Sequence, residues 1–210
     1  MLSYYTVKGE SQSKLEISRS LFICRAKGVE SFEEGMEYIK EISSKHSDAT
    51  HNCYAIRTID NRQKFSDDGE PQGTAGQPIL QALKNKNLHN TAVIVTRYFG
   101  GIKLGASGLA SAYAQSAANA LNQAQIAEMR LCFKARIDME YAQLPKLLQR
   151  FRDDKIILLD TQYTDSVTIE FACPVEDREK IESFLLSLTA GKSQIEWKQK
   201  QYYLYNSLND

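Results

Sequence analysis

The chain has 210 residues, 42% of them hydrophobic and 25% charged, a composition typical of one large or two small globular domains with a buried core. Its 26 basic side chains balance 26 acidic ones, which excludes non-specific coating of nucleic acid by bulk charge but permits a local basic patch. No apolar run reaches the ~18 residues of a membrane helix, and we predict a cytoplasmic protein without a secretion signal.

The N-terminal part of the chain predicts strands followed by a helix. Short apolar runs within residues 4–27 indicate two or three strands. A helix is expected next, because Ser31 and Glu34 have the spacing of a capping box and apolar residues then recur every three or four positions. Residues 49–59 indicate a further strand.

Two glycine-rich blocks, residues 66–78 and 96–109, occupy the middle of the chain. Seven of the 11 glycines lie between positions 69 and 108, and no Asp or Glu occurs from position 71 to 127. The basic residues in that stretch are Lys84, Lys86, Arg97 and Lys103. Glycine lets a backbone turn tightly or approach a partner closely, so the combination indicates a surface that meets an anion.

Regular elements are expected around and between these blocks. Residues 79–83 indicate a short helix, and the continuous β-branched run 91–96 predicts a strand buried on both faces. An Ala- and Ser-rich helix near residues 107–125 would lie close against the sheet because its side chains are small.

After residue 132 glycine almost disappears and a compact order of elements follows. The expected elements are strand 134–140, helix 143–152, strand 156–162, strand 166–172, helix 176–188 and strand 194–203. This β-α-β-β-α-β order is that of a ferredoxin-like domain. We therefore predict an α+β protein with two domains, residues 1–132 and 133–210.

The second glycine block imitates a phosphate-binding loop. Gly100 and Gly105 have the required spacing and Ser107 supplies a hydroxyl, but Ala106 stands where a nucleotide-hydrolysing loop needs Lys. The NTPase interpretation therefore fails. Helix-start amides could still bind a phosphate or carboxylate, although the glycines could instead serve only to pack the helix on the sheet. The candidate anion- and nucleic-acid-binding residues are Arg97, Gly100, Gly101, Lys103, Gly105 and Ser107.

Tyr98 and Phe99 are candidates for a platform on which bases stack. The alternative is that one of the two rings packs on the core.

The acidic turn at residues 67–70 offers carboxylates to a hard cation. It lacks the ligand spacing of a calcium loop, and turn chemistry or an ion pair to Arg97 or Lys103 explains it equally well. We predict neither a metal nor a cofactor.

His51 and Cys53 are two residues apart on the expected strand and so point to the same face. A Cys–His nucleophile also needs a third, orienting group, which the sequence does not identify, so no catalytic residue is predicted. The four cysteines are widely spaced and are expected to be reduced thiols.

Three segments, residues 48–53, 67–76 and 97–105, resemble the signature of the YigZ/IMPACT family. The supporting signature residues are His51, Cys53, Asp67, Asp68, Glu70, Gly73, Thr74 and Gly76. The resemblance covers the first domain and implies a fold like the second domain of small-subunit ribosomal protein S-five. The second domain resembles the C-terminal module of bacterial members, which is similar to a C-terminal domain of elongation factor G.

The chain departs from this family pattern at two positions. Members commonly carry Gly at the position of Ser107 and Arg at that of Ser111, which leaves Arg97 and Lys103 as the principal positive groups.

The resemblance also carries expectations about function. Eukaryotic IMPACT proteins regulate translation through protein contacts in the activation of an initiation-factor kinase, and translation-related or nucleic-acid binding is suggested for bacterial members. We therefore expect a non-catalytic binding protein that regulates translation, with RNA, the ribosome or a translation factor as partner. An enzyme acting on a small phosphorylated substrate or nucleotide, and a protein–protein interaction module, remain as alternatives.

Overall fold

The computed structural model describes residues 1–207 of the chain. The chain folds into two compact units. Tyr4–Glu128 form the first domain, and Met129–Tyr205 together with Met1–Ser3 form the second. Strand β7 (Ile126–Met139) runs through the boundary expected at residue 132. Within the described range no helix combines the length and apolar character needed to cross a membrane.

The first domain is built on a five-stranded antiparallel sheet in the order β2-β3-β6-β4-β5. Its strands are β2 (Glu10–Ile17), β3 (Ser20–Gly28), β4 (His51–Arg57), β5 (Gln63–Ser66) and β6 (Thr91–Tyr98). The segment 4–27, for which two or three strands were predicted, contains three: β1 (Ser3–Val7), β2 and β3. The four-residue β5 was not predicted.

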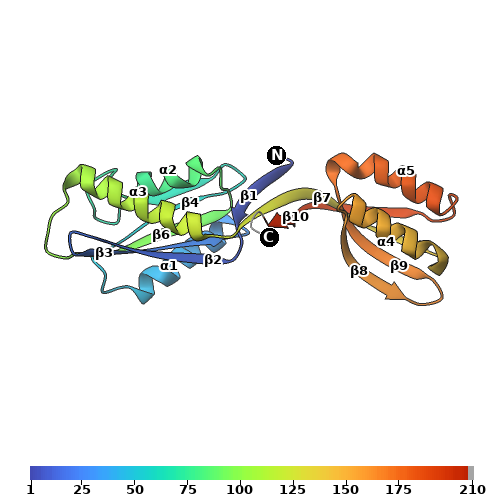
Figure 1. The fold of residues 1–210 in the computed structure, drawn as a ribbon, viewed down its shortest axis with the longest axis horizontal. Coiled ribbons are helices and arrows are strands. Elements are labelled where there is room, and N and C mark those ends of the chain that lie inside the picture. The colour runs from blue at the N-terminus through green and yellow to red at the C-terminus, as the bar shows by residue number, and fades with distance from the viewer. Residues whose placement is uncertain (208–210) are drawn as a thin grey trace. The chain divides into compact units, whose positions relative to one another are not determined.

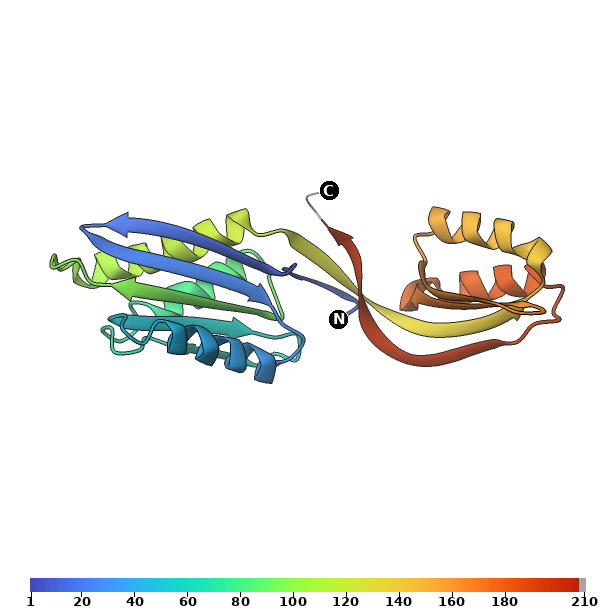
Figure 2. The same cartoon turned by 90° about the horizontal axis from the view of Figure 1, so that it is seen from below.

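Helices cover both faces of this sheet (Figures 1 and 2). The helix α1 (Phe32–Lys45) lies on one face, whereas α2 (Gly76–Asn85) and α3 (Gly105–Gln123) lie side by side on the other. Both faces carry a core, one formed with α2 and α3 and a smaller one formed with α1. The central strand β6 is therefore buried along Thr91–Arg97, as its β-branched run predicts, although its neighbours pair with it antiparallel.

The start of α1 differs in one detail from a capping box. The Ser31 hydroxyl accepts the N–H of Glu34, but the Glu34 carboxylate accepts the N–H of Glu30 rather than that of Ser31. Ser31 is in the extended conformation, with φ −142° and ψ 166°, and the carboxylate reaches one residue farther back along the entering chain.

The second domain confirms the predicted β-α-β-β-α-β order. Its elements are β7, α4 (Leu144–Asp153), β8 (Ile157–Tyr163), β9 (Val167–Pro174), α5 (Arg178–Leu188) and β10 (Ile195–Ser207). The sheet has the order β1-β7-β9-β8, with β10 also paired to β7. Both helices pack into a single core that includes Phe151, Phe171 and Trp197, so the sequence-derived fold class is confirmed.

Candidate functional site

The two glycine blocks meet at one end of the first domain's sheet and enclose a cavity of about 460 Å³. The start of β4, the turn after β5 and the connection from β6 to α3 each contribute residues to its wall. The lining residues are Thr50, His51, Gly69, Glu70, Pro71, Arg97, Phe99, Lys103, Leu104, Gly105, Ala106 and Leu109. The structure thus brings together residues that are up to 59 positions apart (50 to 109).

Asp67 organises the first glycine block. Its carboxylate accepts three backbone N–H groups, from Gly73 at 2.8 Å, Ala75 at 3.0 Å and Gly76 at 2.8 Å. Burial alone would raise the pKa of Asp67, but these three bonds hold it below its ordinary value because they stabilise the ionised form. Asp67 thereby satisfies the free amides at the start of α2.

The neighbouring residues of the block also serve backbone contacts. Asp68 accepts the N–H of Asn52 at 2.6 Å, and the Thr74 hydroxyl donates to the carbonyl of Pro71 at 2.6 Å. A Cβ on Gly76 would lie 2.8 Å from the backbone of Ser66, so only glycine lets α2 start so close to β5. No group of three or more His, Cys, Asp and Glu residues within 1–207 is arranged to hold a metal ion.

Glu70 joins the two glycine blocks through a buried polar contact. Its Oε1 accepts Arg97 Nη1 at 2.6 Å and the Tyr113 hydroxyl at 2.7 Å. The side chains of Glu70 and Arg97 are only 3% and 6% exposed, so each needs the other's charge. Of the interpretations that the sequence leaves open for the acidic turn, the structure shows two: turn chemistry at Asp67 and Asp68 and an ion pair between Glu70 and Arg97.

Arg97 keeps hydrogen-bonding capacity despite this pairing. Its Nη2 lies 3.5 Å from the hydroxyl of Ser20, and its Nε is buried without a partner among the described residues. The guanidinium also lies 5.4 Å from the ring centroids of Phe22 and Phe99. Arg97 is therefore part of the cavity wall and does not project from the surface.

His51 and Cys53 both lie near the contacts among Glu70, Arg97 and Tyr113, but in different environments. The Cys53 Sγ lies 2.9 Å from the carbonyl oxygen of Asp67 and 3.4 Å from the Tyr113 hydroxyl, either of which can accept its one hydrogen, and burial raises the pKa of the thiol to about 12. The thiol is thus protonated at neutral pH and is not a ready nucleophile. His51, in contrast, lines the cavity, and its Nε2 lies 3.8 Å from Glu70 Oε2.

The second glycine block makes a tight connection between β6 and α3. Gly100 donates its N–H to Ser20, and a Cβ there would come within 2.0 Å of the Arg19 backbone. Gly101 and Gly105 have φ values of +86° and +70°, which L-residues with a side chain rarely adopt. The loop therefore depends on its glycines for its shape.

The start of α3 is open toward the cavity. Its N-cap residue, Leu104, offers no side-chain hydrogen bond, and the first turn contains no acidic residue. Lys103 is exposed and forms no ion pair within residues 1–207. Ser107 is exposed in the first turn but does not line the cavity. The free amides and the unpaired ammonium make this end of the cavity positive.

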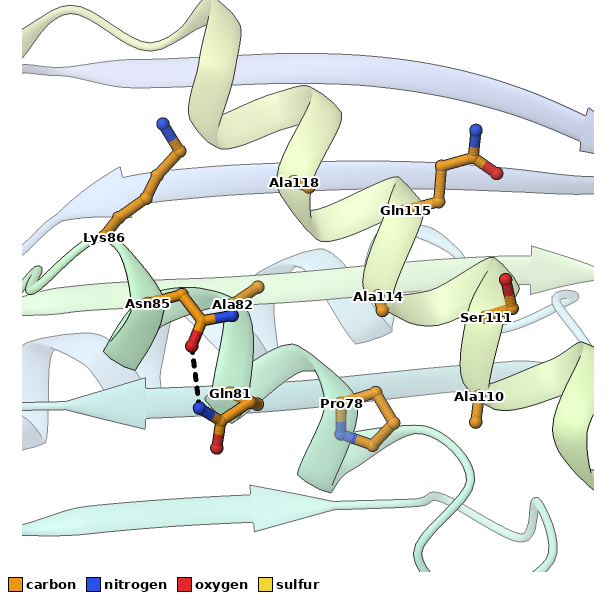
Figure 3. Close-up of a pocket in the computed structure, with 10 residues that line it drawn as sticks. All are labelled: Pro78, Gln81, Ala82, Asn85, Lys86, Ala110, Ser111, Ala114, Gln115 and Ala118. Carbon is orange, nitrogen blue, oxygen red and sulfur yellow. Dashed lines mark hydrogen bonds between the residues drawn. The ribbon is translucent and has the colours of Figure 1, made fainter.

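A groove of about 630 Å³ runs between α2 and α3 on the outer side of the same helical layer (Figure 3). Ala110, Ala114 and Ala118 follow one side of α3 at four-residue intervals. Lys86 stands at the end of α2, and Gln81 donates to Asn85 at 2.8 Å. Neither helix bears a carboxylate.

Sequence reasoning missed two residues of the site. Tyr113, within the predicted Ala- and Ser-rich helix, was not named as a site residue, but a buried Tyr hydroxyl requires a hydrogen-bond partner, and here that partner is Glu70. Ser20 was not considered, although its hydroxyl contacts both Arg97 and Gly100. Neither contact has a local sequence signal, because the partners are 43 to 80 residues apart.

Comparison with known families divides the chain in the same way. The family described as Impact N-terminal domain matches residues 18–121, and the domain of unknown function DUF1949 matches residues 137–192.

Individual proteins match over different lengths of the chain. "IMPACT family member YvyE" of Bacillus subtilis is 40% identical over 204 residues, which are 95% of this chain and 93% of that protein. "IMPACT family member YigZ" of Escherichia coli is 32% identical, covering 86% of this chain and 90% of that protein. "Protein IMPACT" of Homo sapiens is 39% identical over 66 residues, 30% of this chain and 21% of that protein.

A solved structure supports the fold independently. The crystal structure of a hypothetical protein superposes with a TM-score of 0.64 at 27% identity, and the match covers 95% of this chain and 98% of that one.

Proposed function

This chain belongs to the IMPACT family, and we propose that it is a non-catalytic binding protein that regulates translation by contacting RNA, either free or within the ribosome. Eukaryotic IMPACT is a translation-related regulator. The observation that carries the RNA contact is the acid-free face formed by α2, α3 and the loop between β6 and α3.

Charge distribution on this face favours a polyanion. From position 71 to 127 the chain has no Asp or Glu, while Lys86 and Lys103 are exposed and the amides that start α3 are free of side-chain caps. Phosphate oxygens are the groups that lysines and helix N-termini bind in nucleic acids. Because the whole chain has a net charge of zero, we expect a polyanion to be attracted to this face and not to the molecule as a whole.

The glycine loop favours close approach by the same partner. Gly101 and Gly105 are exposed and have open space where a side chain would project, so they leave the backbone of the loop uncovered at these two positions. Arg97 contributes from the cavity wall rather than from the surface. We therefore assign the outer phosphate contacts to Lys86 and Lys103.

The test is a salt series on binding to single-stranded RNA, measured by fluorescence anisotropy. Removing one lysine–phosphate contact should reduce the slope of log affinity against log salt by about 0.7. We expect this reduction for Lys86→Gln and for Lys103→Gln, and about twice that for the double variant. Lys146→Gln is the matched control, because Lys146 is equally exposed but belongs to α4 of the second domain.

The RNA contact would be contradicted if binding were undetectable. It would also be contradicted if the salt slope were the same for the two folded lysine variants as for the unaltered chain. A partner that survives nuclease treatment in a pull-down would point instead to a protein contact, for which the groove between α2 and α3 in Figure 3 offers a surface.

An enzyme acting on a small phosphorylated substrate is a second candidate, favoured by one observation. The cavity places a buried carboxylate, Glu70, and an imidazole, His51, beside the open start of α3. Turnover of phosphorylated metabolites, followed as release of inorganic phosphate with and without Mg²⁺, separates this function from binding. Lys103→Gln should reduce such turnover. If no metabolite of a broad panel were turned over, the enzymatic function would be rejected.

A further inference from the structure

The Glu70 carboxylate has one oxygen that the protein leaves without a hydrogen bond. Oε1 accepts from Arg97 and Tyr113, but Oε2 accepts no hydrogen bond from the part of the chain that the structure describes. The side chain is 97% buried (3% exposed) and forms part of the cavity wall. This oxygen is not among the side-chain atoms that are closed off from solvent without a partner, so it opens onto the cavity and can accept a hydrogen bond from a ligand there.

His51 presents a second acceptor at the same place. Its Nδ1 lies 2.7 Å from the backbone carbonyl of Asp68, and since a carbonyl only accepts, Nδ1 carries the hydrogen. In the neutral ring Nε2 is then an acceptor, and it lies 3.8 Å from Glu70 Oε2. Two acceptors therefore face one another across 3.8 Å, a gap in which one hydroxyl hydrogen can be shared between them.

Hydrogen-bond donors and a positive charge line another part of the cavity wall. Gly105 and Ala106 from the uncapped first turn of α3 line the cavity together with the unpaired Lys103. With neutral His51 the charged lining side chains are Glu70, Arg97 and Lys103, and since Arg97 compensates Glu70, one positive charge remains. A ligand that fits must carry both a hydroxyl donor and an anionic group.

Phe99 adds an apolar platform to this combination. The residue is 45% exposed and lines the cavity, and the Arg97 guanidinium lies 5.4 Å from the centroid of its ring. Exposed aromatic rings beside a cation are the surfaces on which bases stack. The volume of about 460 Å³ falls within the range of small-ligand pockets.

We propose that this cavity binds a ribonucleotide unit and distinguishes it from a deoxyribonucleotide. The 2′-hydroxyl shares its one hydrogen between Glu70 Oε2 and His51 Nε2 in a three-centre hydrogen bond, the phosphate binds Lys103 and the start of α3, and the base stacks on Phe99. For RNA as the source of this unit, the inference rests on the RNA binding proposed above. A free mononucleotide offers the same chemistry, and the experiment separates the two sources.

The experiment compares a single-stranded RNA with the DNA of the same sequence, in which uracil replaces thymine, by fluorescence anisotropy on the full chain. A hydrogen bond to a charged group supports a preference for RNA of about tenfold or more. Glu70→Gln keeps the side-chain shape but puts an amide in place of the carboxylate. His51→Ala removes the second acceptor without disturbing the Glu70–Arg97 pair, so it keeps the test decisive if Glu70→Gln is poorly folded.

We expect both variants to bring the RNA-to-DNA affinity ratio close to one. Lys103→Gln is the matched control, which should weaken RNA and DNA equally and preserve their ratio. Equal affinity of the unaltered protein for RNA and DNA would overturn the inference but leave nucleic-acid binding intact.

Free nucleotides provide the second arm. Thermal shifts with AMP and dAMP test the cavity without any contribution from the outer face. If neither oligonucleotide binds, RNA binding fails, and a shift with AMP but not with dAMP would then assign the cavity to a free ribonucleotide. The absence of both oligonucleotide binding and an AMP shift would overturn the ribonucleotide site altogether.

Discussion

At the scale of single residues, Glu70 holds the two glycine blocks together. It lies in the first block, yet its bonds go to Arg97 in the second block and to Tyr113 in α3. The sequence held a partial signal for this contact. Arg97 directly follows the run, residues 91–96, that is predicted to be buried on both faces, and a charged side chain buried there requires an opposite charge. What the sequence lacked was the choice of partner among the nearby carboxylates, which tertiary contact decides.

Arg97→Met should be strongly destabilising, because it leaves Glu70 buried without its cation. We expect the free energy of unfolding, measured by urea denaturation, to fall by about 3–5 kcal/mol. Adding Glu70→Gln should recover part of that loss, since the double variant has no uncompensated buried charge. Additive losses in the two single variants and their combination would contradict the pairing. Glu41→Gln, which removes the exposed contact to Lys45, is the control and should have no measurable effect.

His89 should make the protein less stable in mild acid. Burial and, to a lesser degree, Arg57 hold its pKa below the ordinary value of 6.5, against an opposing hydrogen bond to the carbonyl of Thr58. The unfolded chain therefore binds a proton more readily than the folded one, and stability declines as pH falls below about 6.5.

Replacing His89 with Gln should flatten this decline in unfolding free energies measured between pH 5 and 8. The pKa of His46 is also lowered by burial, but His46 is present in both proteins and cancels in the comparison. Parallel pH profiles for the variant and the unaltered chain would show that His89 does not cause the decline.

At the scale of elements, local sequence patterns predicted the helices and strands whose structure is determined by their own residues. The buried run of β6, the periodic helices and the β-α-β-β-α-β order of the second domain were all predicted and are present. The strand β5 was missed because Gln63, Lys64 and Phe65 are exposed and Ser66 is polar, so its only signal is its pairing with β4. The cavity could not be predicted as such, because three separate connections form it.

The start of α2 should depend on Asp67. Asp67→Ala removes the acceptor of three backbone N–H groups, and we expect a loss of about 2 kcal/mol in unfolding free energy. Because the folded pKa of Asp67 is depressed, its contribution is complete above the ordinary value of 3.8 and declines as pH falls below it. Hydrogen exchange should show faster opening of the Gly73, Ala75 and Gly76 amides. Asp68→Ala, which removes one such bond, should cost less, and an equal cost would argue against the cap.

The loop from β6 to α3 should tolerate a side chain at one glycine far better than at its neighbour. Gly100→Ala places a Cβ within 2.0 Å of the Arg19 backbone and should cost about 1–3 kcal/mol by overpacking. Gly101→Ala meets open space and incurs only the strain of φ +86°, about 1 kcal/mol. Thermal denaturation of both variants measures the difference, and a larger cost at Gly101 would mean that backbone strain outweighs the clash.

At the scale of the whole molecule, the two domains have separate cores. The clusters around β6 draw only on residues of the first domain, and the cluster around Phe171 draws only on residues of the second. The only tryptophan of the sequence, Trp197, packs against that second cluster. Its fluorescence therefore reports on the second domain, whereas far-UV circular dichroism reports on both.

Unfolding in urea should separate these two signals when only the first domain is weakened. Arg97→Met removes a contact within the first domain, so the circular dichroism transition should acquire an earlier phase while the Trp197 fluorescence midpoint stays where it is in the unaltered chain. Two-state behaviour is not expected for a chain with independent cores. Phe151→Ala, in the core of the second domain, is the reciprocal control and should shift the fluorescence midpoint. If Arg97→Met moved the fluorescence midpoint equally, the two cores would unfold as one cooperative unit.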